Sequence, residues 1–106
     1  MQTKIKTILA ELRSRLEAVY GERLAGVVLY GSQARGDAEP GSDIDVLVVL
    51  KGPVSPAEEI ERTIQDVADL SLRFEETVCC LFMDEDRFTR RNGPLLRNIR
   101  REGIPV

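Results

Sequence analysis

The sequence predicts an α+β fold of the α/β-sandwich type, a small mixed β-sheet with helices packed mainly on one face. Apolar residues recur at helical spacing over residues 3–20 and again over 56–74, which predicts two amphipathic helices. Apolar runs at 24–30, 43–50 and 77–83 have the length of strands. Glycine and proline residues separate these segments and mark the turns between them.

The signals along the chain give the order α-β-β-α-β-α-(β). The first helix, residues 3–20, is followed by Gly21, which suits a helix C-terminus. Leu24–Tyr30 is the first expected strand and Asp43–Leu50 the second. The loop between the two strands carries three turn signals, Gly36, Pro40 and Gly41.

A second long helix is expected to follow Ser55, with Pro56 at its first position and Glu58 completing a capping box. This helix is expected to run to about Phe74, before a third strand over Thr77–Met83. Its predicted buried stripe consists of Ile60, Ile64, Val67, Ala68 and Ser71.

The C-terminal part is predicted to be a broken helix. Asp84 is expected to cap it, and Gly93-Pro94 to interrupt it. The helix resumes through Ile99 and stops at Gly103, and residues 104–106 are a candidate short edge strand.

The most informative segment, residues 31–45, joins the first two strands. Asp43 and Asp45 lie two positions apart, so in a strand their side chains point to the same face. Two adjacent like charges repel unless a positive charge lies between them. The natural occupant is a hard cation, and Mg²⁺ is the usual one where phosphates are also bound.

The glycine-serine turn at the start of this segment has the features of a phosphate-binding site. Gly31 lacks a Cβ, so its backbone can approach a ligand closely, and Ser32 offers a hydroxyl and a backbone N–H. A helix that begins here would attract anions. Taken singly, Ser32 and Asp43 are better explained as caps or turn residues, and Asp45 as a solvated strand residue. As an ordered set they predict a site for a metal-bound nucleoside triphosphate.

The run Gly-Ser-x-Ala-Arg-Gly followed by Ser-Asp-Ile-Asp resembles the signature of the DNA polymerase β-like nucleotidyltransferases, most closely the minimal nucleotidyltransferases of prokaryotes. Residues 74–88 and 94–104 also resemble the C-terminal half of these domains. The resemblance implies an Mg²⁺-dependent enzyme that moves a nucleoside monophosphate from an NTP, expected to be ATP, to a hydroxyl acceptor. In the family two metal ions take part.

The resemblance also implies roles for single residues. Asp43 and Asp45 would be the catalytic, Mg²⁺-binding carboxylates, and Gly31 and Ser32 would bind the β- and γ-phosphates. Arg35 would be a further phosphate contact. The alternative for Arg35, equally open at this point, is a loop arginine paired with one of two nearby acids, Asp37 or Glu39.

One position departs from the family pattern. Active members carry a third carboxylate on the next strand, and here that position falls on Cys79, a poor ligand for Mg²⁺. None of the neighbouring acids, Glu75, Glu76 and Asp84, is placed to substitute for it. The expectation is therefore one bound Mg²⁺ with the nucleotide, and transfer that is weak, absent or dependent on a partner.

The resemblance suggests a partner as well. Minimal nucleotidyltransferases often pair with a helical HEPN-domain toxin, either modifying one of its tyrosines or blocking it as an antitoxin. Two hypotheses therefore stand: an enzyme, or a catalytically weak or inactive antitoxin or nucleotide-binding subunit that acts by binding a partner protein. A homo-oligomer is a further expectation that the sequence leaves open.

The amino-acid composition narrows the classes of fold and of catalytic mechanism that the chain can have. The 106 residues, 42% hydrophobic and 31% charged, suit a single domain over residues 1–106. The absence of histidine excludes Ser-His-Asp and Cys-His hydrolase mechanisms. Adjacent Cys79 and Cys80 would face opposite sides of a strand, which favours two free thiols and a cytoplasmic location. No apolar run approaches the ~20 residues that span a bilayer.

The charge is unevenly distributed. Residues 1–86 carry 9 basic and 17 acidic side chains, whereas residues 87–106 carry 6 basic and 1 acidic. A solvated helix face is the simplest interpretation of the basic segment, and a docking surface for an acidic partner is the next. Direct nucleic-acid binding is not expected, because the net charge is −3 and aromatic residues make up only 5% of the chain.

Overall fold

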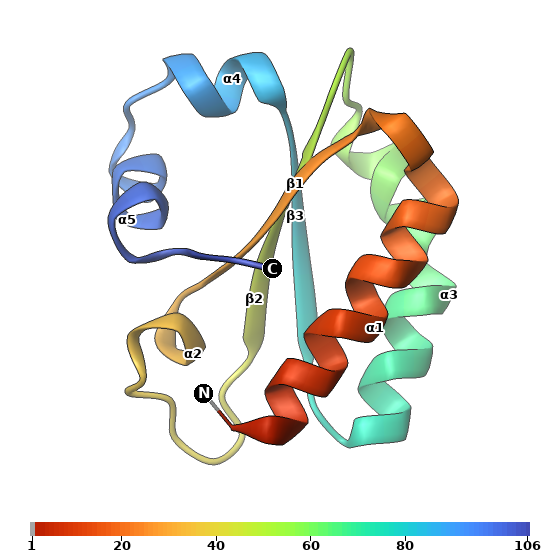
Figure 1. Cartoon of the computed structure of the whole chain (residues 1–106), viewed down its shortest axis with the longest axis vertical. Coiled ribbons are helices and arrows are strands. Elements are labelled where there is room, and N and C mark those ends of the chain that lie inside the picture. The colour runs from red at the N-terminus through yellow and green to blue at the C-terminus, as the bar shows by residue number, and fades with distance from the viewer. Residues whose placement is uncertain (1) are drawn as a thin grey trace.

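The strands form one mixed sheet with the order β3-β2-β1-β4 in the computed structural model, which describes residues 2–106 (Figure 1). β1 (Leu24–Tyr30) runs antiparallel to both β2 (Ile44–Leu50) and β4 (Ile104–Pro105). β2 and β3 (Val78–Asp84) are parallel, and a long helix makes the crossover between them. This arrangement confirms the predicted fold class.

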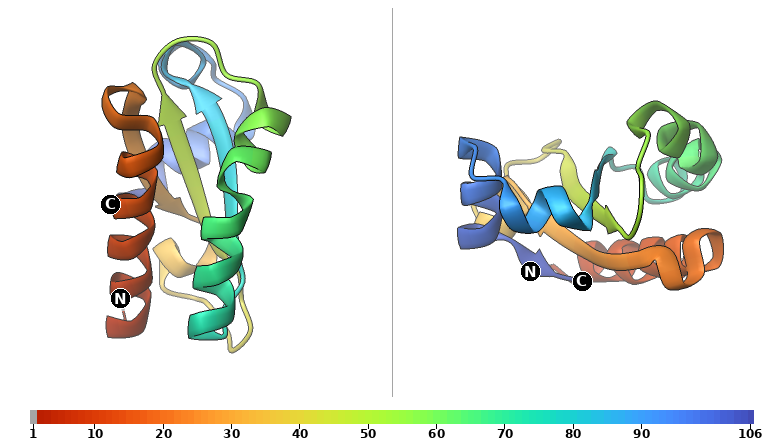
Figure 2. Two further views of the ribbon diagram at one scale, coloured as in Figure 1. Left: turned by 90° about the vertical axis from the view of Figure 1, so that its right-hand side faces the viewer. Right: turned by 90° about the horizontal axis from the view of Figure 1, so that it is seen from above.

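The helices cover both faces of the sheet unequally. The two long helices, α1 and α3, lie side by side on one face, and the shorter α4 and α5 lie on the other (Figures 1 and 2). The bounds of the helices are α1 Thr3–Tyr20, a 3-10 turn Gly21–Arg23, α2 Ser32–Arg35, α3 Pro56–Phe74, α4 Glu85–Arg90 and α5 Pro94–Glu102.

Two apolar clusters hold these layers together. The larger one lies between the sheet and the α1/α3 layer, where Ile8, Leu12 and Leu16 of α1 are at most 1% exposed. The smaller one packs Leu96 and Ile99 of α5 against the opposite face of β2. β2 is therefore covered on both sides, which explains why its sequence is an almost continuous apolar run.

The predicted inward face of α3 was wrong. Ile60 and Ile64 are 48% and 51% exposed, Ala68 is also exposed, and Ser71 is half-buried. The residues that face the core are Glu59, Thr63 and Leu70, with Val67 and Phe74 partly buried. On this inward face the buried Glu59 carboxylate is satisfied by a hydrogen bond of 2.9 Å from the Tyr20 hydroxyl on α1 and an ion pair with Arg62.

The helix boundaries follow most of the sequence signals. Asp84 caps α4, since its carboxylate accepts a 2.7 Å hydrogen bond from the backbone N–H of Arg87. Pro56 occupies the first turn of α3 as expected. The capping box was wrong, because within the described chain the Ser55 hydroxyl makes no capping hydrogen bond to α3. Among residues 2–106, no helix combines the length and apolar character needed to cross a membrane.

Candidate nucleotide and metal site

The glycine-serine turn lies where β1 ends. Gly31 has a φ of +76°, which L side chains rarely adopt, and a Cβ at this position would lie 2.5 Å from Oδ2 of Asp45. The positive φ therefore favours glycine here, and any Cβ would also force the Asp45 carboxylate to shift. α2 follows as a single helical turn, and the N–H groups of its first two residues, Ser32 and Gln33, have no intrahelical acceptor. The turn thus presents free donors directly beside a carboxylate.

The two aspartates and Cys79 converge beneath this turn. Asp45 on β2 lies opposite Cys79 in the parallel register and opposite Tyr30 on β1. Asp43 precedes β2 and points the same way, and the ligand atoms of Asp43, Asp45 and Cys79 all lie within 4.8 Å of one another. The Cys79 thiol donates a hydrogen bond of 3.8 Å to Oδ2 of Asp43. The structure therefore brings the predicted carboxylate pair together with the residue expected at the third position.

The electrostatics of this cluster favour a bound cation. Burial raises the pKa of Asp45, and the neighbouring charge of Asp43 raises it further, while Arg35 acts in the opposite direction. Burial also raises the pKa of the Cys79 thiol, and both aspartates add to the effect. Negative charge is thus disfavoured at both positions, and a divalent cation among the three groups would relieve that penalty.

Arg35 lies at the edge of the cluster and is held from two sides. Its guanidinium forms ion pairs of 3.2 Å with Asp37 and 3.5 Å with Glu102 at the end of α5. The expected partner Asp37 is thus present, whereas the ion pair with Glu102 was not foreseen. Arg35 lines the same small cavity as Gly31, so its guanidinium lies beside the turn.

A small cavity of about 190 Å³ adjoins the turn. Tyr30, Gly31 and Arg35 form one wall, and α5 supplies Leu95, Asn98, Ile99 and Glu102 as the other. Sequence reasoning missed the α5 contribution, because these residues carry no motif and reach the turn only through the tertiary fold. The one available signal was Glu102, the single acid in an otherwise basic segment.

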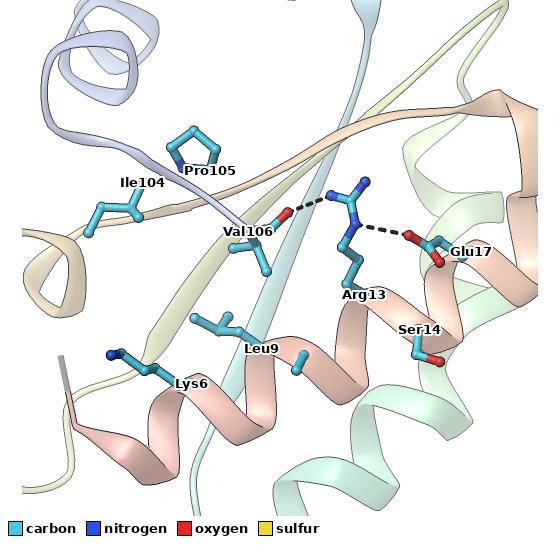
Figure 3. A pocket seen from close by; sticks show the side chains of 9 residues that line it. Lys6, Leu9, Arg13, Ser14, Glu17, Ile104, Pro105 and Val106 are labelled. Carbon is cyan, nitrogen blue, oxygen red and sulfur yellow. Dashed lines mark hydrogen bonds and ion pairs between the residues drawn. The ribbon is translucent and has the colours of Figure 1, made fainter.

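A larger groove lies elsewhere. It measures about 420 Å³ and runs between α1 and β4, where Leu9, Ile104 and Val106 form much of its wall (Figure 3). Arg13 bridges the groove by donating a 2.5 Å hydrogen bond to the carbonyl of Val106 and forming an ion pair with Glu17. None of the predicted site residues lines this groove, so its size does not identify the chemical site.

The donor set at the cluster fits a divalent cation. The two carboxylates and the thiol have ligand atoms within 4.8 Å of one another, and the pair of carboxylates suits Mg²⁺. The sulfur does not, because hard cations prefer oxygen. The residues therefore fit a divalent metal ion. The two carboxylates suit Mg²⁺, whereas the Cys79 thiol suits a softer ion.

A glycine-serine turn beside an Asp-x-Asp pair at one end of a mixed sheet is the arrangement expected of a nucleotidyl-transfer domain. The chain belongs to the nucleotidyltransferase domain family, whose model matches residues 5–101. This membership confirms the family resemblance that the motif suggested.

Two named proteins with similar sequences support membership of this family. Two proteins of Methanocaldococcus jannaschii, both named provisionally as protein adenylyltransferases, are similar to the chain. One is 29% identical over 91 residues, which span 77% of this chain and 91% of the relative. The other is 31% identical over 94 residues, which span 88% of each.

Solved structures share the fold. A toxin–antitoxin crystal structure with AMP-PNP gives a TM-score of 0.66 at 17% identity and covers 91% of this chain and 69% of that chain. A crystal structure of a mutant of the toxin–antitoxin MntA-HpeT gives 0.63 at 18% identity, covering 99% of this chain and 72% of the other. At these identities the comparison shows the fold alone.

Proposed function

We propose that this protein is an adenylyltransferase that moves AMP from ATP to a hydroxyl group of a partner protein. The observation that carries the proposal is the packing of Gly31 directly against Asp45, with Asp43 on the same side. That contact supports a site in which the backbone donors of the turn and the carboxylate pair act together. The names of the two M. jannaschii relatives and the family membership support the same reaction class.

Each residue has a separate task in this proposal. The N–H groups and hydroxyl at Ser32 bind the outer phosphates, and the absence of a Cβ at Gly31 leaves room for them. Asp43 and Asp45 hold Mg²⁺, which neutralises charge on the triphosphate when it is bound. Arg35 adds a positive charge at the rim, and its ion pair with Glu102 keeps the guanidinium close to the turn.

The reaction itself is a displacement at phosphorus. The acceptor oxygen forms a bond to the α-phosphorus, the bond to the bridging oxygen breaks, and pyrophosphate leaves with that electron pair. The hydroxyl proton passes to solvent or to one of the two aspartates. Positioning and charge neutralisation supply most of the acceleration in such transfers.

We further propose that the acceptor is a tyrosine of a HEPN-type helical toxin and that the protein acts as its antitoxin. The two fold neighbours come from toxin–antitoxin structures, one of them with an ATP analogue, which supports both a partner and ATP as the donor. Arg87, Arg91 and Arg97 of the basic C-terminal segment are exposed, which suits contact with an acidic partner surface.

A second candidate function is inhibition by binding alone. Cys79 favours it, because the position facing the aspartates carries a thiol where the family pattern has a carboxylate. In that case nucleotide and partner would bind without transfer of AMP. The acceptor protein would then be inhibited stoichiometrically instead of covalently.

Adenylyl transfer and inhibition by binding alone can be distinguished by incubating the protein with ATP labelled at the α-phosphate and a co-expressed partner, and measuring the label on the partner. We expect labelled partner with the wild type and loss of label in Asp43→Asn and Asp45→Asn, which keep the side-chain shape. Asp86→Asn is the matched control, since this α4 side chain is 71% exposed and far from the motif in sequence. Partner inhibition without label in the wild type would reject the enzyme and support the binding function.

A further inference from the structure

β3 forms one edge of the sheet, and its outer side is open. In the described part of the chain it pairs with β2 alone, and α3 lies beside it (Figure 2). Ile44 of β2 donates its N–H to the carbonyl of Thr77, so the odd-numbered residues of β3 direct their backbone groups toward β2. The N–H and C=O groups of Val78, Cys80 and Phe82 therefore point outward, past the edge of the sheet.

The fold satisfies the first of these outward N–H groups and leaves the next two residues unpaired. The Val78 N–H donates to the Ser71 hydroxyl of α3 at 3.2 Å. The described residues provide no partner for the N–H and C=O groups of Cys80 and Phe82. An unpaired edge of this kind is a template for another strand, and natural sheets protect it with charged residues or proline. Residues 78–83 contain neither.

An apolar stripe on α3 runs beside this open edge. Ile60 and Ile64 are 48% and 51% exposed, and together with Val67 they line a groove of about 150 Å³. Cys80 and Phe82 of β3 line the same groove. These three helix residues belong to the stripe that the sequence predicts to be buried. None of the residues that line the groove is charged, so covering it would bury no unpaired charge.

An occupant of this surface must supply a strand for the edge and an apolar helix face for the groove. A helical partner could cover the stripe, but it has no extended backbone to pair with Cys80 and Phe82. β3 and α3 of a second copy supply both, in the same relative position. We infer that this edge is a dimerisation surface, on which β3 of a second copy pairs antiparallel with β3 and extends the four-stranded sheet across the interface. The inference goes beyond the proposed function and does not depend on it.

The unpaired groups set the register of the two strands. A twofold axis at Leu81 places Cys80 opposite Phe82 of the second copy, and residues so paired exchange two N–H···O bonds in an antiparallel sheet. The same axis passes close to α3, because Ser71 lies beside Val78. At about 3.3 Å per strand residue and about 1.5 Å per helix residue, Leu81 is level with residue 64 of α3. The two copies of Ile64 would therefore meet near the axis.

The expected interface is small. The seven residues of β3 extend over about 23 Å, and the edge of the sheet with its helix layer is about 20 Å deep. Roughly 400–500 Å² of each copy would be covered, or roughly 800–1,000 Å² in total, which is below the size of standard interfaces and typical of weak ones. We therefore expect a dimer in equilibrium with the monomer at micromolar concentrations of the chain.

The test is analytical ultracentrifugation of the full chain over a range of concentrations. We expect the mass of the wild type to rise toward that of two chains as the concentration increases. Ile64→Glu should raise the Kd of the dimer at least about tenfold, because two carboxylates would meet near the axis. Leu95→Glu is its matched control, since Leu95 is 48% exposed on the other face of the sheet. Cys80→Pro removes an outward N–H that Cys80→Ser keeps, so only the proline variant should remain monomeric.

A wild type that stays monomeric at every concentration would overturn the inference. Equal dimerisation of Ile64→Glu and Leu95→Glu, or of Cys80→Pro and Cys80→Ser, would do the same, because the dimer would then use another surface. Circular dichroism checks the fold of each variant. If a variant folds poorly, amide hydrogen exchange of the wild type decides: dilution should speed exchange at Cys80 and Phe82 but not at Leu81, whose N–H faces β2. Protection of the first two amides only in the presence of a co-expressed partner would assign the edge to another protein and reject the dimer.

Discussion

Replacing Gly31 with alanine should damage the site more than the fold. The new Cβ would lie 2.5 Å from Oδ2 and 3.3 Å from the carboxyl carbon of Asp45, so that the carboxylate must rotate away. The residue would also hold a φ of +76°, which costs about 1–3 kcal/mol for a residue other than glycine. A loss of that size should lower Tm by roughly 4–8 °C per kcal/mol in a domain of this length.

Gly41→Ala separates the two effects. Gly41 has a φ of +86°, but a Cβ there would meet nothing within 4 Å. Both variants should therefore lose stability, while only Gly31→Ala should also lose affinity for Mg²⁺-ATP, by at least about tenfold if one metal ligand is displaced. Thermal unfolding and calorimetric titration measure the two quantities. Equal ATP affinity in Gly31→Ala and Gly41→Ala would refute the argument that Gly31 positions Asp45.

Two further predictions concern the α3 interface. Leu70→Ala should lower the free energy of unfolding, measured in urea, by about 2–5 kcal/mol, because Leu70 is fully buried. Ile60→Ala should lower it far less, because Ile60 is 48% exposed. Equal losses in the two variants would contradict the observed orientation of α3. Burial alone would raise the pKa of Glu59, but hydrogen bonds from Tyr20 and Arg62 outweigh it, so the pKa lies below its ordinary value. The stability from Glu59 should be fully present above about pH 4.5 and fall as pH drops through the folded-state pKa. Urea titrations from pH 3 to 7 should show this acid-dependent loss in the wild type and not in Glu59→Gln, and parallel curves would contradict it.

Much of the fold follows from local patterns in the sequence. The α1 bounds follow from its helical periodicity, and its C-terminus from Gly21, whose φ is +54°. The shared face of Asp43 and Asp45 follows from strand parity alone. Asp84 was predicted as a helix cap because its side chain can satisfy a free N–H of the first turn, and it does so.

Two of the misses involve pairing between residues far apart in the chain, whereas the absent capping box at Ser55 is a local miss. Glu59 reads as a surface residue, yet it is 2% exposed and its carboxylate accepts a hydrogen bond from Tyr20, 39 positions earlier. The ion pair between Arg35 and Glu102 likewise depends on how α5 packs against the sheet. Local patterns carry no information on such contacts.

The proposed function depends most directly on binding of Mg²⁺-ATP by the carboxylate pair. The decisive measurement is a calorimetric titration of ATP, with and without Mg²⁺, into the wild type, Asp43→Asn/Asp45→Asn and the Asp86→Asn control. We predict Mg²⁺-dependent binding in the wild type and the control and none in the double variant. Equal binding by all three proteins would contradict a nucleotide and metal site at Asp43 and Asp45.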